Sequence, residues 1–383
     1  IHVHFIGIGG ISMSGLAELL LDRGFKVSGS DSQNSEAVEK LISLGAQVKI
    51  PQSAENIDDD TKLVVYTAAI HDDNPELIAA RQSGIPTVTR ADFLGAVMRN
   101  YELPVSIAGT HGKTTTTSMI SEVLLKADKN PTISVGGMLP SIGGNFRVGA
   151  DKFFITEACE YTNSFLSFFQ KIAIILNVDA DHLDFFKDLD DIRSSFHKFA
   201  SSVPEDGYLI INNEIENLEE LTAGLKCKVI TYGSDSKADY YPGNILFDGF
   251  AHASFTLNKK GKALGKIELS VPGKHNIYNS IAAFIACSLL GLSFEEIAPS
   301  LGEYHGTDRR FQKKGEFNGV TVIDDYAHHP TEIRAAIDAA RHCPHRTIWL
   351  VFQPHTYSRT KALFSEFADA LSNSDRVILA DIY

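Results

Sequence analysis

A loop containing Gly112, Lys113 and Thr114 is the part of the chain whose residue types indicate chemistry most directly. It follows a short apolar strand expected at 103–107 and opens a helix. In that setting backbone N–H groups and the helix N-terminus face phosphates, the lysine reaches the outer phosphates, and the first threonine hydroxyl binds magnesium. The spacing departs from the common G-x-x-x-x-G-K-S/T pattern, because Ile107 and not glycine lies five residues before Gly112. The loop predicts a shortened nucleoside-triphosphate site made of Gly109, Thr110, His111, Gly112, Lys113, Thr114 and Thr115; the alternative is an ordinary turn with a solvated lysine.

A second glycine-rich turn lies at the start of the chain, where Gly7, Gly9 and Gly10 follow the first expected strand. Glycines at this place let the backbone approach a pyrophosphate above a helix N-terminus. The dinucleotide fingerprint is broken, because Ser12 stands where the third glycine belongs, although Asp31 ends the next strand near the usual place of a ribose-binding acid. The motif indicates a nucleotide or sugar-nucleotide without distinguishing NAD from a UDP-sugar, and a purely structural turn is the alternative.

Acidic residues and a histidine follow two apolar strands near the Gly-Lys-Thr loop. Glu157 ends the run 153–157, and Asp179, Asp181 and His182 follow the run 172–178. Ligands of parallel α/β sheets bind at the carboxyl ends of strands, and magnesium prefers hard oxygen ligands. Thr114, Glu157 and His182 are therefore candidate metal-site residues, although a helix cap or a hydrogen-bonded structural histidine would also explain His182.

Two further motifs could complete a nucleotide site. Asn276 and Asn279 are three residues apart at the start of an expected helix, so they share a face and could orient a base or phosphate; N-capping is the equal alternative. Arg310 lies at an expected joint near 306, where it could reach a γ-phosphate when domains close. A solvated joint would explain it as well.

The last part of the chain carries a mixed polar set. Asp325, Tyr326 and His329 follow the strand expected at 319–324, and His355 and Arg359 follow the strand expected at 347–352. Both groups are expected at carboxyl ends of one sheet, so they should converge. The combination suits an amino-acid ligand whose carboxylate is gripped by arginine. A zinc site from His328 and His329 is a weak alternative, because adjacent residues rarely point the same way.

Composition sets the class of protein. The chain has 383 residues, 44% hydrophobic and 22% charged, with a net charge of −13, which indicates two or three globular domains and no nucleic-acid partner. Its four cysteines are widely spaced, which favours a reducing cytoplasm. The apolar run 281–292 is too short to cross a bilayer, so no membrane insertion is expected. Both ends look cut, and the third domain is expected to be incomplete.

Alternating strand and helix patterns predict an α/β chain with domains at 1–100, 101–306 and 307–383. In the first domain the expected strands are 2–6, 26–30, 63–67 and 86–88, and the helices 11–23, 35–44, 74–83 and 91–98. The second has strands at 103–107, 153–157, 171–178, 207–211 and 227–231, short antiparallel strands within 238–272, and a helix at 275–291. The third reads as strand 319–324, helix 330–341, strand 347–352, helix 360–372 and strand 376–380.

In the order of these motifs, over essentially its whole length, the chain resembles the Mur ligase family of peptidoglycan synthesis. The resemblance implies a Rossmann-like domain for a UDP-sugar, a central P-loop ATPase domain and a Rossmann-like C-terminal domain for an amino acid. It implies ATP and Mg²⁺, with Lys113, Glu157, His182 and Arg310 as catalytic residues. Asn276, Asn279 and Asp325 would join the ATP loop, and Tyr326, His329, His355 and Arg359 would surround the amino acid. The UDP-sugar would lie near Gly7, Gly9, Gly10, Ser12, Met13, Ser14, Asp31, His71 and Arg90.

The implied reaction joins L-alanine to the lactyl carboxylate of UDP-N-acetylmuramate through an acyl phosphate, in a monomer or homodimer. One departure concerns Thr356, where some relatives carry a second arginine, so the grip on the amino-acid carboxylate is weaker or differently shared. The alternatives are a ligase that recycles a whole tripeptide onto the same sugar, an NAD-dependent oxidoreductase, and a non-catalytic sugar-nucleotide sensor. A dehydrogenase would leave the central loop unexplained, and a sensor need not keep every charged residue of it.

Overall fold

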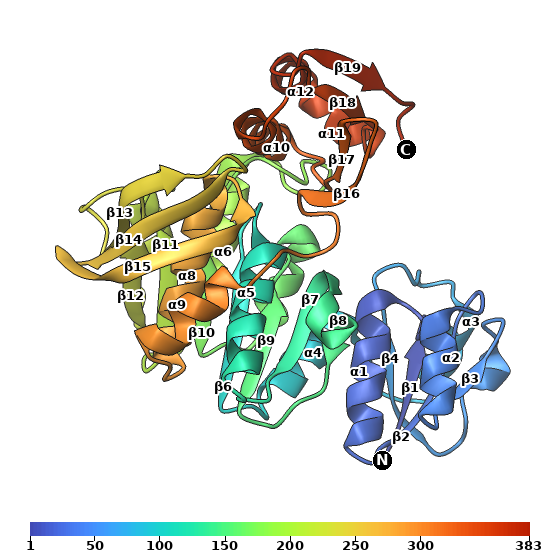
Figure 1. Cartoon of the computed structure of the whole chain (residues 1–383). Helices are drawn as coiled ribbons and strands as arrows, with labels where there is room; N and C mark the ends of the chain where they lie inside the picture. Colours follow the sequence, from blue (N-terminus) through green and yellow to red (C-terminus); the bar gives the residue numbers. More distant parts are fainter.

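The computed structural model describes residues 1–383 and divides their strands among four sheets. A five-stranded sheet contains the first strands of the chain, a ten-stranded sheet the middle ones, and two two-stranded sheets the last ones. In Figure 1 the first and last parts lie apart, each beside the large central part. None of the helices combines the length and hydrophobicity that a bilayer crossing requires.

The N-terminal sheet is parallel, with the strand order β3-β2-β1-β4-β5. Its strands are β1 (His2–Ile6), β2 (Lys26–Ser30), β3 (Gln47–Lys49), β4 (Thr61–Tyr66) and β5 (Thr87–Thr89). The helices are α1 (Ile11–Asp22), α2 (Glu36–Ser43), α3 (Pro75–Gln82) and α4 (Arg90–Met98), with a 3-10 turn η1 (Ala54–Asn56). The expected alternation of strands and helices is confirmed, and only the three-residue β3 was missed.

One face of this sheet buries a chain of hydrogen bonds. His2 and His4 share a face of β1, and their rings lie 2.7 and 2.8 Å from the Ser28 hydroxyl between them. His4 also lies 3.2 Å from the carboxylate of Glu76, which is fully buried and accepts a hydrogen bond from Ser30. The two buried histidines are thus satisfied within the domain.

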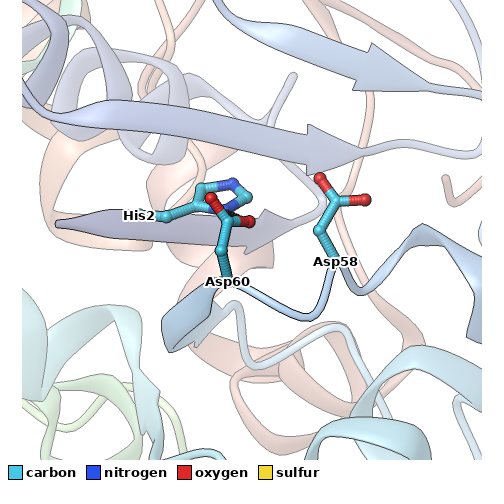
Figure 2. Close-up of side chains that lie close together, drawn as sticks. All are labelled: His2, Asp58 and Asp60. Atoms are coloured by element: carbon cyan, nitrogen blue, oxygen red, sulfur yellow. Dashed lines mark hydrogen bonds and ion pairs between the residues drawn. The ribbon is translucent and has the colours of Figure 1, made fainter.

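At one end of this series of hydrogen bonds, His2 lies close to two acidic residues, Asp58 and Asp60 (Figure 2). The His2 ring lies 2.7 Å from Asp60, and Lys26 donates to the same carboxylate at 2.8 Å. With its other nitrogen on Ser28, the His2 ring has no free ligand atom. The group is therefore explained by hydrogen bonds and an ion pair.

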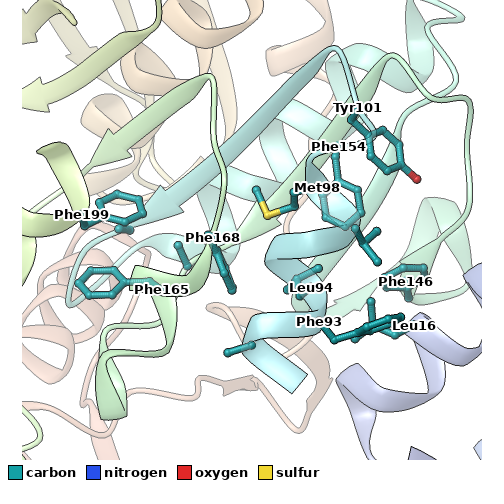
Figure 3. Packing of buried hydrophobic residues seen from close by; sticks show 14 of the residues in the cluster. Leu16, Phe93, Leu94, Met98, Tyr101, Phe146, Phe154, Phe165, Phe168 and Phe199 are labelled. Carbon is teal, nitrogen blue, oxygen red and sulfur yellow. The ribbon is translucent and has the colours of Figure 1, made fainter. Parts of the chain in front are cut away.

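The N-terminal and central parts share one apolar core (Figure 3). A Cβ atom added to Gly15 of α1 would lie 2.3 Å from the ring of Phe146, and one on Gly95 of α4 would lie 1.8 Å from the carbonyl oxygen of Ser167. Contacts this close require glycine at both positions. The first two parts of the chain consequently pack as one unit.

The central sheet has the order β15-β14-β13-β12-β11-β10-β6-β9-β7-β8. Its strands are β6 (Leu103–Ala108), β7 (Thr132–Leu139), β8 (Gly144–Arg147), β9 (Phe153–Glu157), β10 (Ile172–Ile175), β11 (Tyr208–Asn212), β12 (Lys228–Tyr232), β13 (Tyr240–Phe247), β14 (His252–Lys259) and β15 (Lys262–Pro272). Strands β6, β7 and β9 to β12 pair in parallel, and β13 to β15 are antiparallel as expected.

The central helices cover this sheet. They are α5 (Lys113–Lys126), α6 (Leu189–Ser201), α7 (Leu218–Thr222), α8 (His275–Leu289) and α9 (Phe294–Gly302), with 3-10 segments η2 (Pro140–Ile142) and η3 (Tyr161–Ser167). Strand β6 lies between β10 and β9, so the loop that follows it opens between the segments after those two strands. This arrangement gathers the expected nucleotide residues at one edge of the sheet.

The C-terminal part corrects one expectation. Strands β16 (Gln312–Phe317) and β17 (Val320–Asp324) form an antiparallel pair, whereas β18 (Trp349–Phe352) and β19 (Arg376–Leu379) form a separate parallel pair. The strands expected at 319–324 and 347–352 are therefore not in one sheet. Asn318 and Gly319, both with positive φ, close a tight hairpin between β16 and β17, whereas β18 pairs with β19 alone. The helices are α10 (Pro330–His342), α11 (Tyr357–Ala362) and α12 (Phe364–Leu371), so the helix expected at 360–372 is two helices.

Candidate functional site

The loop between β6 and α5 has the geometry of an anion cradle. Gly109 and Gly112 have φ values of +140° and +83°, which favour glycine. A Cβ atom on Gly112 would lie 2.7 Å from the Asn279 side-chain oxygen, so the loop approaches α8 closely. No side chain caps the N-terminus of α5, whose first N–H groups are therefore free for an anion.

The segment after β10 holds this loop in place. The Asn177 side chain accepts a hydrogen bond from the His111 backbone N–H at 2.7 Å and donates to the His111 carbonyl at 3.0 Å. The Asp179 backbone N–H donates to the Thr110 hydroxyl at 2.9 Å. Asn177 was not among the predicted site residues, because an isolated asparagine after a strand carries no motif.

Lys113 points back over the loop. Its ammonium group donates to the Thr110 carbonyl at 3.1 Å, to the Gly109 carbonyl, and to the Glu160 carboxylate at 3.1 Å. Burial on its own would lower the pKa of Lys113, but Glu160 outweighs it and holds that pKa above its ordinary value. The lysine therefore stays charged, and a bound phosphate would compete with Glu160 for it. Glu160, like Asn177, was not among the predicted site residues.

Glu157 and Thr114 face two adjacent glycines of β7, Gly136 and Gly137 respectively. Glu157 accepts a hydrogen bond from the Gly136 backbone N–H at 2.6 Å, and a Cβ atom on Gly136 would lie 2.7 Å from its other carboxylate oxygen. A Cβ atom on Gly137 would lie 3.1 Å from the Thr114 methyl group. The glycines clear space beside a hydroxyl and a carboxylate, which are hard oxygen donors that suit Mg²⁺.

His182 follows β10 with a φ of +53°. Its ring centroid lies 4.6 Å from that of Tyr161, and its Nε2 lies 3.7 Å from a carboxylate oxygen of Asp181. Burial lowers the pKa of His182, so its imidazole is neutral and could act as a ligand. Its charged neighbours include Glu160 and Lys113, which places it at the edge of the phosphate loop.

The two asparagines of α8 lie under the loop. Asn279 donates to Asn276 at 3.0 Å, Asn276 donates to the Pro272 carbonyl at 2.7 Å, and both are almost fully buried. Lys274, not an asparagine, occupies the N-cap of α8. N-capping is therefore not the role of either residue, and Asn279 lies beside Gly112 of the loop.

The joint between the central and C-terminal parts reaches the phosphate loop. Arg310 donates to the Thr114 hydroxyl at 3.3 Å, and its guanidinium lies 5.6 Å from the Tyr326 ring centroid. Asp325 accepts hydrogen bonds at 2.7 Å from the backbone N–H groups of Phe311 and Ala327. Asp325 thus shapes the backbone that carries Arg310, and burial raises its pKa.

Three of the four predicted amino-acid residues lie beside the segment after β10, although not through a common sheet. Arg359 donates to the carboxylate of Asp181 at 2.9 and 3.3 Å, and the His329 ring lies 3.2 Å from the Ala180 carbonyl. His355 and Arg359 line a pocket of about 250 Å³, together with Tyr161, Asp181, His182, Leu183, Asp184, Thr356, Ser358, Ala362 and Leu363. Tyr326 is half exposed and packs on His328 and Arg310, outside this pocket.

The expected UDP-sugar residues are only partly gathered. The backbone N–H of Gly9 donates to Asp31 at 2.8 Å, so this acid braces the glycine turn. The Met13 side chain is buried in the core, whereas Gly10 leaves the N-terminus of α1 without a side-chain cap. Ser14 donates to a carbonyl of its own helix, and Gly7 has a φ of +81°. Ser12 lies in the first turn of α1, and His71 is exposed after β4.

Arg90 opens α4 and lies near Cys159, two residues beyond Glu157. Burial lowers the pKa of the Arg90 guanidinium, and the nearby Cys159 raises it by a smaller amount. Arg90 thus belongs to the N-terminal part and interacts with a residue of the central part that follows β9.

Family models match three successive parts of the chain. Residues 2–102 match the Mur ligase family catalytic domain, residues 107–287 the Mur ligase middle domain, and residues 309–382 the Mur ligase glutamate ligase domain. The proteins named UDP-N-acetylmuramate–L-alanine ligase from Lachnospira eligens and Agathobacter rectalis are each 59% identical to this chain, over all of it and 84% and 83% of their own lengths.

Solved structures give the same grouping. The UDP-N-acetylmuramate–alanine ligase of Thermotoga maritima superposes with a TM-score of 0.82 at 32% identity, over all of this chain and 85% of its own. A murein peptide ligase of Psychrobacter arcticus superposes with a TM-score of 0.77 at 24% identity, over 99% of this chain and 84% of its own, a likeness of fold alone.

Proposed function

The chain belongs to the Mur ligase family, and on that premise we propose that it joins L-alanine to the lactyl carboxylate of UDP-N-acetylmuramate at the expense of ATP. The single observation that carries the proposal is the meeting of Lys113, Thr114 and Arg310 at one loop, with the Arg359 pocket against the segment after β10. A phosphate loop with an arginine-containing pocket nearby suits the activation of one substrate by ATP and its capture by an amino acid.

We assign the UDP-sugar to residues 1–100, ATP to 101–306 and the amino acid to 307–383. Thr114, Glu157 and His182 would hold Mg²⁺, which supplies neutralisation of phosphate charge when bound. Asn276 and Asn279 would act on the nucleotide indirectly, because they support the loop that binds it. We propose that the protein acts in the cytoplasm as a monomer or homodimer, without a nucleic-acid partner.

In the proposed reaction an oxygen of the lactyl carboxylate attacks the γ-phosphorus of ATP. The bond between that phosphorus and the oxygen that bridges it to the β-phosphate breaks. ADP leaves, and an acyl phosphate of the sugar nucleotide remains. The amine of L-alanine then attacks the acyl carbon, and inorganic phosphate leaves with the original carboxylate oxygen. Lys113 and Arg310 stabilise the charge that builds on the phosphate, and positioning supplies most of the acceleration.

The alanine ammonium must lose a proton before it attacks. His329 is a candidate base, because it lies in the predicted amino-acid site and burial lowers its pKa, which favours the neutral ring. Its Nε2 lies 3.2 Å from the Ala180 carbonyl, however, and its Nδ1 accepts the Thr331 N–H at 3.3 Å. With both nitrogens occupied, His329 is better suited to positioning than to proton transfer.

The tripeptide-recycling alternative keeps the same first half-reaction. The pocket beside Arg359 has a volume of about 250 Å³ and is lined by the segment after β10 and by residues 355–363. The 59% identical relatives named for L-alanine favour the alanine reaction. A sensor or an oxidoreductase would give no reason for Lys113 and Glu160 to form a buried ion pair beside a phosphate loop.

The acyl-phosphate route predicts the fate of one oxygen atom. With the lactyl carboxylate labelled with ¹⁸O, phosphate released in the presence of L-alanine should carry one labelled oxygen, detected by mass spectrometry. Release of unlabelled phosphate would contradict the proposed activation of the carboxylate. Unlabelled substrate in labelled water is the control, and its phosphate should stay unlabelled.

A further inference from the structure

Glu332 on α10 contacts the phosphate loop from the other side of the domain joint. Its Oε1 lies 3.2 Å from Nδ1 of His111, and its Oε2 accepts the His328 backbone N–H at 3.0 Å. The carboxylate is mostly buried, with 14% of its side chain exposed. One residue therefore joins the loop before α5 to the turn that begins α10.

His111 lies between two carboxylates. Its Nε2 is 3.2 Å from Asp179, an ion-pair distance at an angle too bent for a hydrogen bond, and its Nδ1 faces Glu332. Burial on its own would lower the pKa of His111, but Asp179 and Glu332 raise it to about 9. The ring is therefore an imidazolium at neutral pH. We call the group of Asp179, His111 and Glu332 the His111 bridge.

The rest of the joint is polar as well. Arg310 contacts Thr114, Arg359 contacts Asp181, and the His329 ring lies 4.6 Å from the His111 ring. The apolar cluster of the C-terminal part holds seven buried residues and is separate from the 38-residue cluster that joins the N-terminal and central parts. The C-terminal part therefore shares no apolar core with the central one and is held by these polar contacts and by a ring contact between Phe247 and His342.

We infer that Glu332 is a positioning residue, which holds the C-terminal part against the phosphate loop through His111. Held in this way, the C-terminal part brings Arg310 beside Thr114 and Arg359 beside Asp181. The inference rests on the proposed function, since it concerns how ATP and the amino acid come to share one site. It gives His111 a task that its position in the phosphate loop does not by itself reveal.

The test is a double-mutant cycle in the full chain with Glu332→Gln, His111→Gln and the double variant. Each single variant should lower kcat/KM for L-alanine about 10-fold, as expected for a buried charge pair, while affinity for UDP-N-acetylmuramate stays unchanged. The double variant should be no worse than the worse single one. Glu366→Gln is the matched control, because the Glu366 side chain is in the first turn of α12 and makes no hydrogen bond.

A second readout does not depend on turnover. With Mg²⁺ and a non-hydrolysable ATP analogue, small-angle X-ray scattering should give Glu332→Gln a larger radius of gyration than the unaltered chain or Glu366→Gln. Equal radii, or losses that multiply in the double variant, would overturn the inference. Failure of the unaltered chain to release phosphate with any acceptor would instead overturn the proposed function, and the scattering comparison would still test the bridge.

Discussion

Replacement of Lys113 by alanine should lower turnover by about 10³-fold, the upper end of the loss seen when one transition-state donor is removed. The reason is that its ammonium group is the cation nearest the loop carbonyls, at 3.1 Å from Thr110, and is the group that can reach the outer phosphates. UDP-N-acetylmuramate should still bind, because its assigned site lies in residues 1–100. The measurements are phosphate release for kcat and calorimetry for sugar binding.

Removal of Lys113 also leaves Glu160 buried without its partner, which costs about 3–5 kcal/mol of stability when a buried pair is broken. The double variant Lys113→Ala/Glu160→Gln should recover most of that stability, measured by thermal unfolding, without recovering turnover. Lys126→Ala is the matched control, since Lys126 ends the same helix in an exposed ion pair with Glu303. Loss of sugar binding in the folded double variant would show that the assignment of the domains is wrong.

Replacement of Arg359 by alanine should raise KM for L-alanine about 10- to 100-fold, the range for a hydrogen-bonded charged group, and change KM for ATP much less. Arg359 lines the pocket, and its Nε and Nη2 donate to Asp181, so its Nη1 side remains for a substrate carboxylate. Thr356 contributes no second cation there, which makes the pocket depend on Arg359. Initial rates at varied alanine and varied ATP give the two constants.

Lys361→Ala is the control for charge near the pocket, because Lys361 lies on the same helix and outside the pocket lining. Asp181→Asn combined with Arg359→Ala separates loss of the grip from the cost of an unpaired Asp181. An unaltered KM for alanine in Arg359→Ala would remove Arg359 from the amino-acid site.

Much of the fold could be predicted because its signals are local. Apolar runs ended by glycine or acidic residues marked β1, β6 and β9, and alternation with glycine-bounded turns marked the antiparallel strands from β13 to β15. Strand β7 was missed because Gly136 and Gly137 disfavour a strand, although both are needed to clear space for Glu157 and Thr114. Helix α6 was missed because its residues are mostly polar.

The pairing of β17 was predicted wrongly for a different reason. A strand–helix–strand pattern favours parallel neighbours, but β17 pairs with β16 across the Asn318-Gly319 turn, a strong hairpin signal. The turn signal is local and part of the sequence, whereas the parallel pattern spans more than thirty residues and does not fix which strands pair.

Some residues of the candidate site could be predicted from the sequence and others could not. The loop from Gly109 to Thr115, with Glu157, could be selected from residue type and position after a strand. Glu160, Asn177 and Glu332 could not, because their roles depend on neighbours that the fold supplies; Glu332 is 221 residues from His111. A residue that only positions another side chain has no sequence motif, whereas the residues of the phosphate loop do.

The most direct test of the central claim is phosphate release from Mg-ATP with UDP-N-acetylmuramate, with L-alanine and the tripeptide compared as acceptors. We predict rapid release with L-alanine, little with the tripeptide, and background release when the sugar nucleotide is omitted. Faster release with the tripeptide would make the chain a recycling ligase. Release with neither acceptor would contradict the proposed reaction.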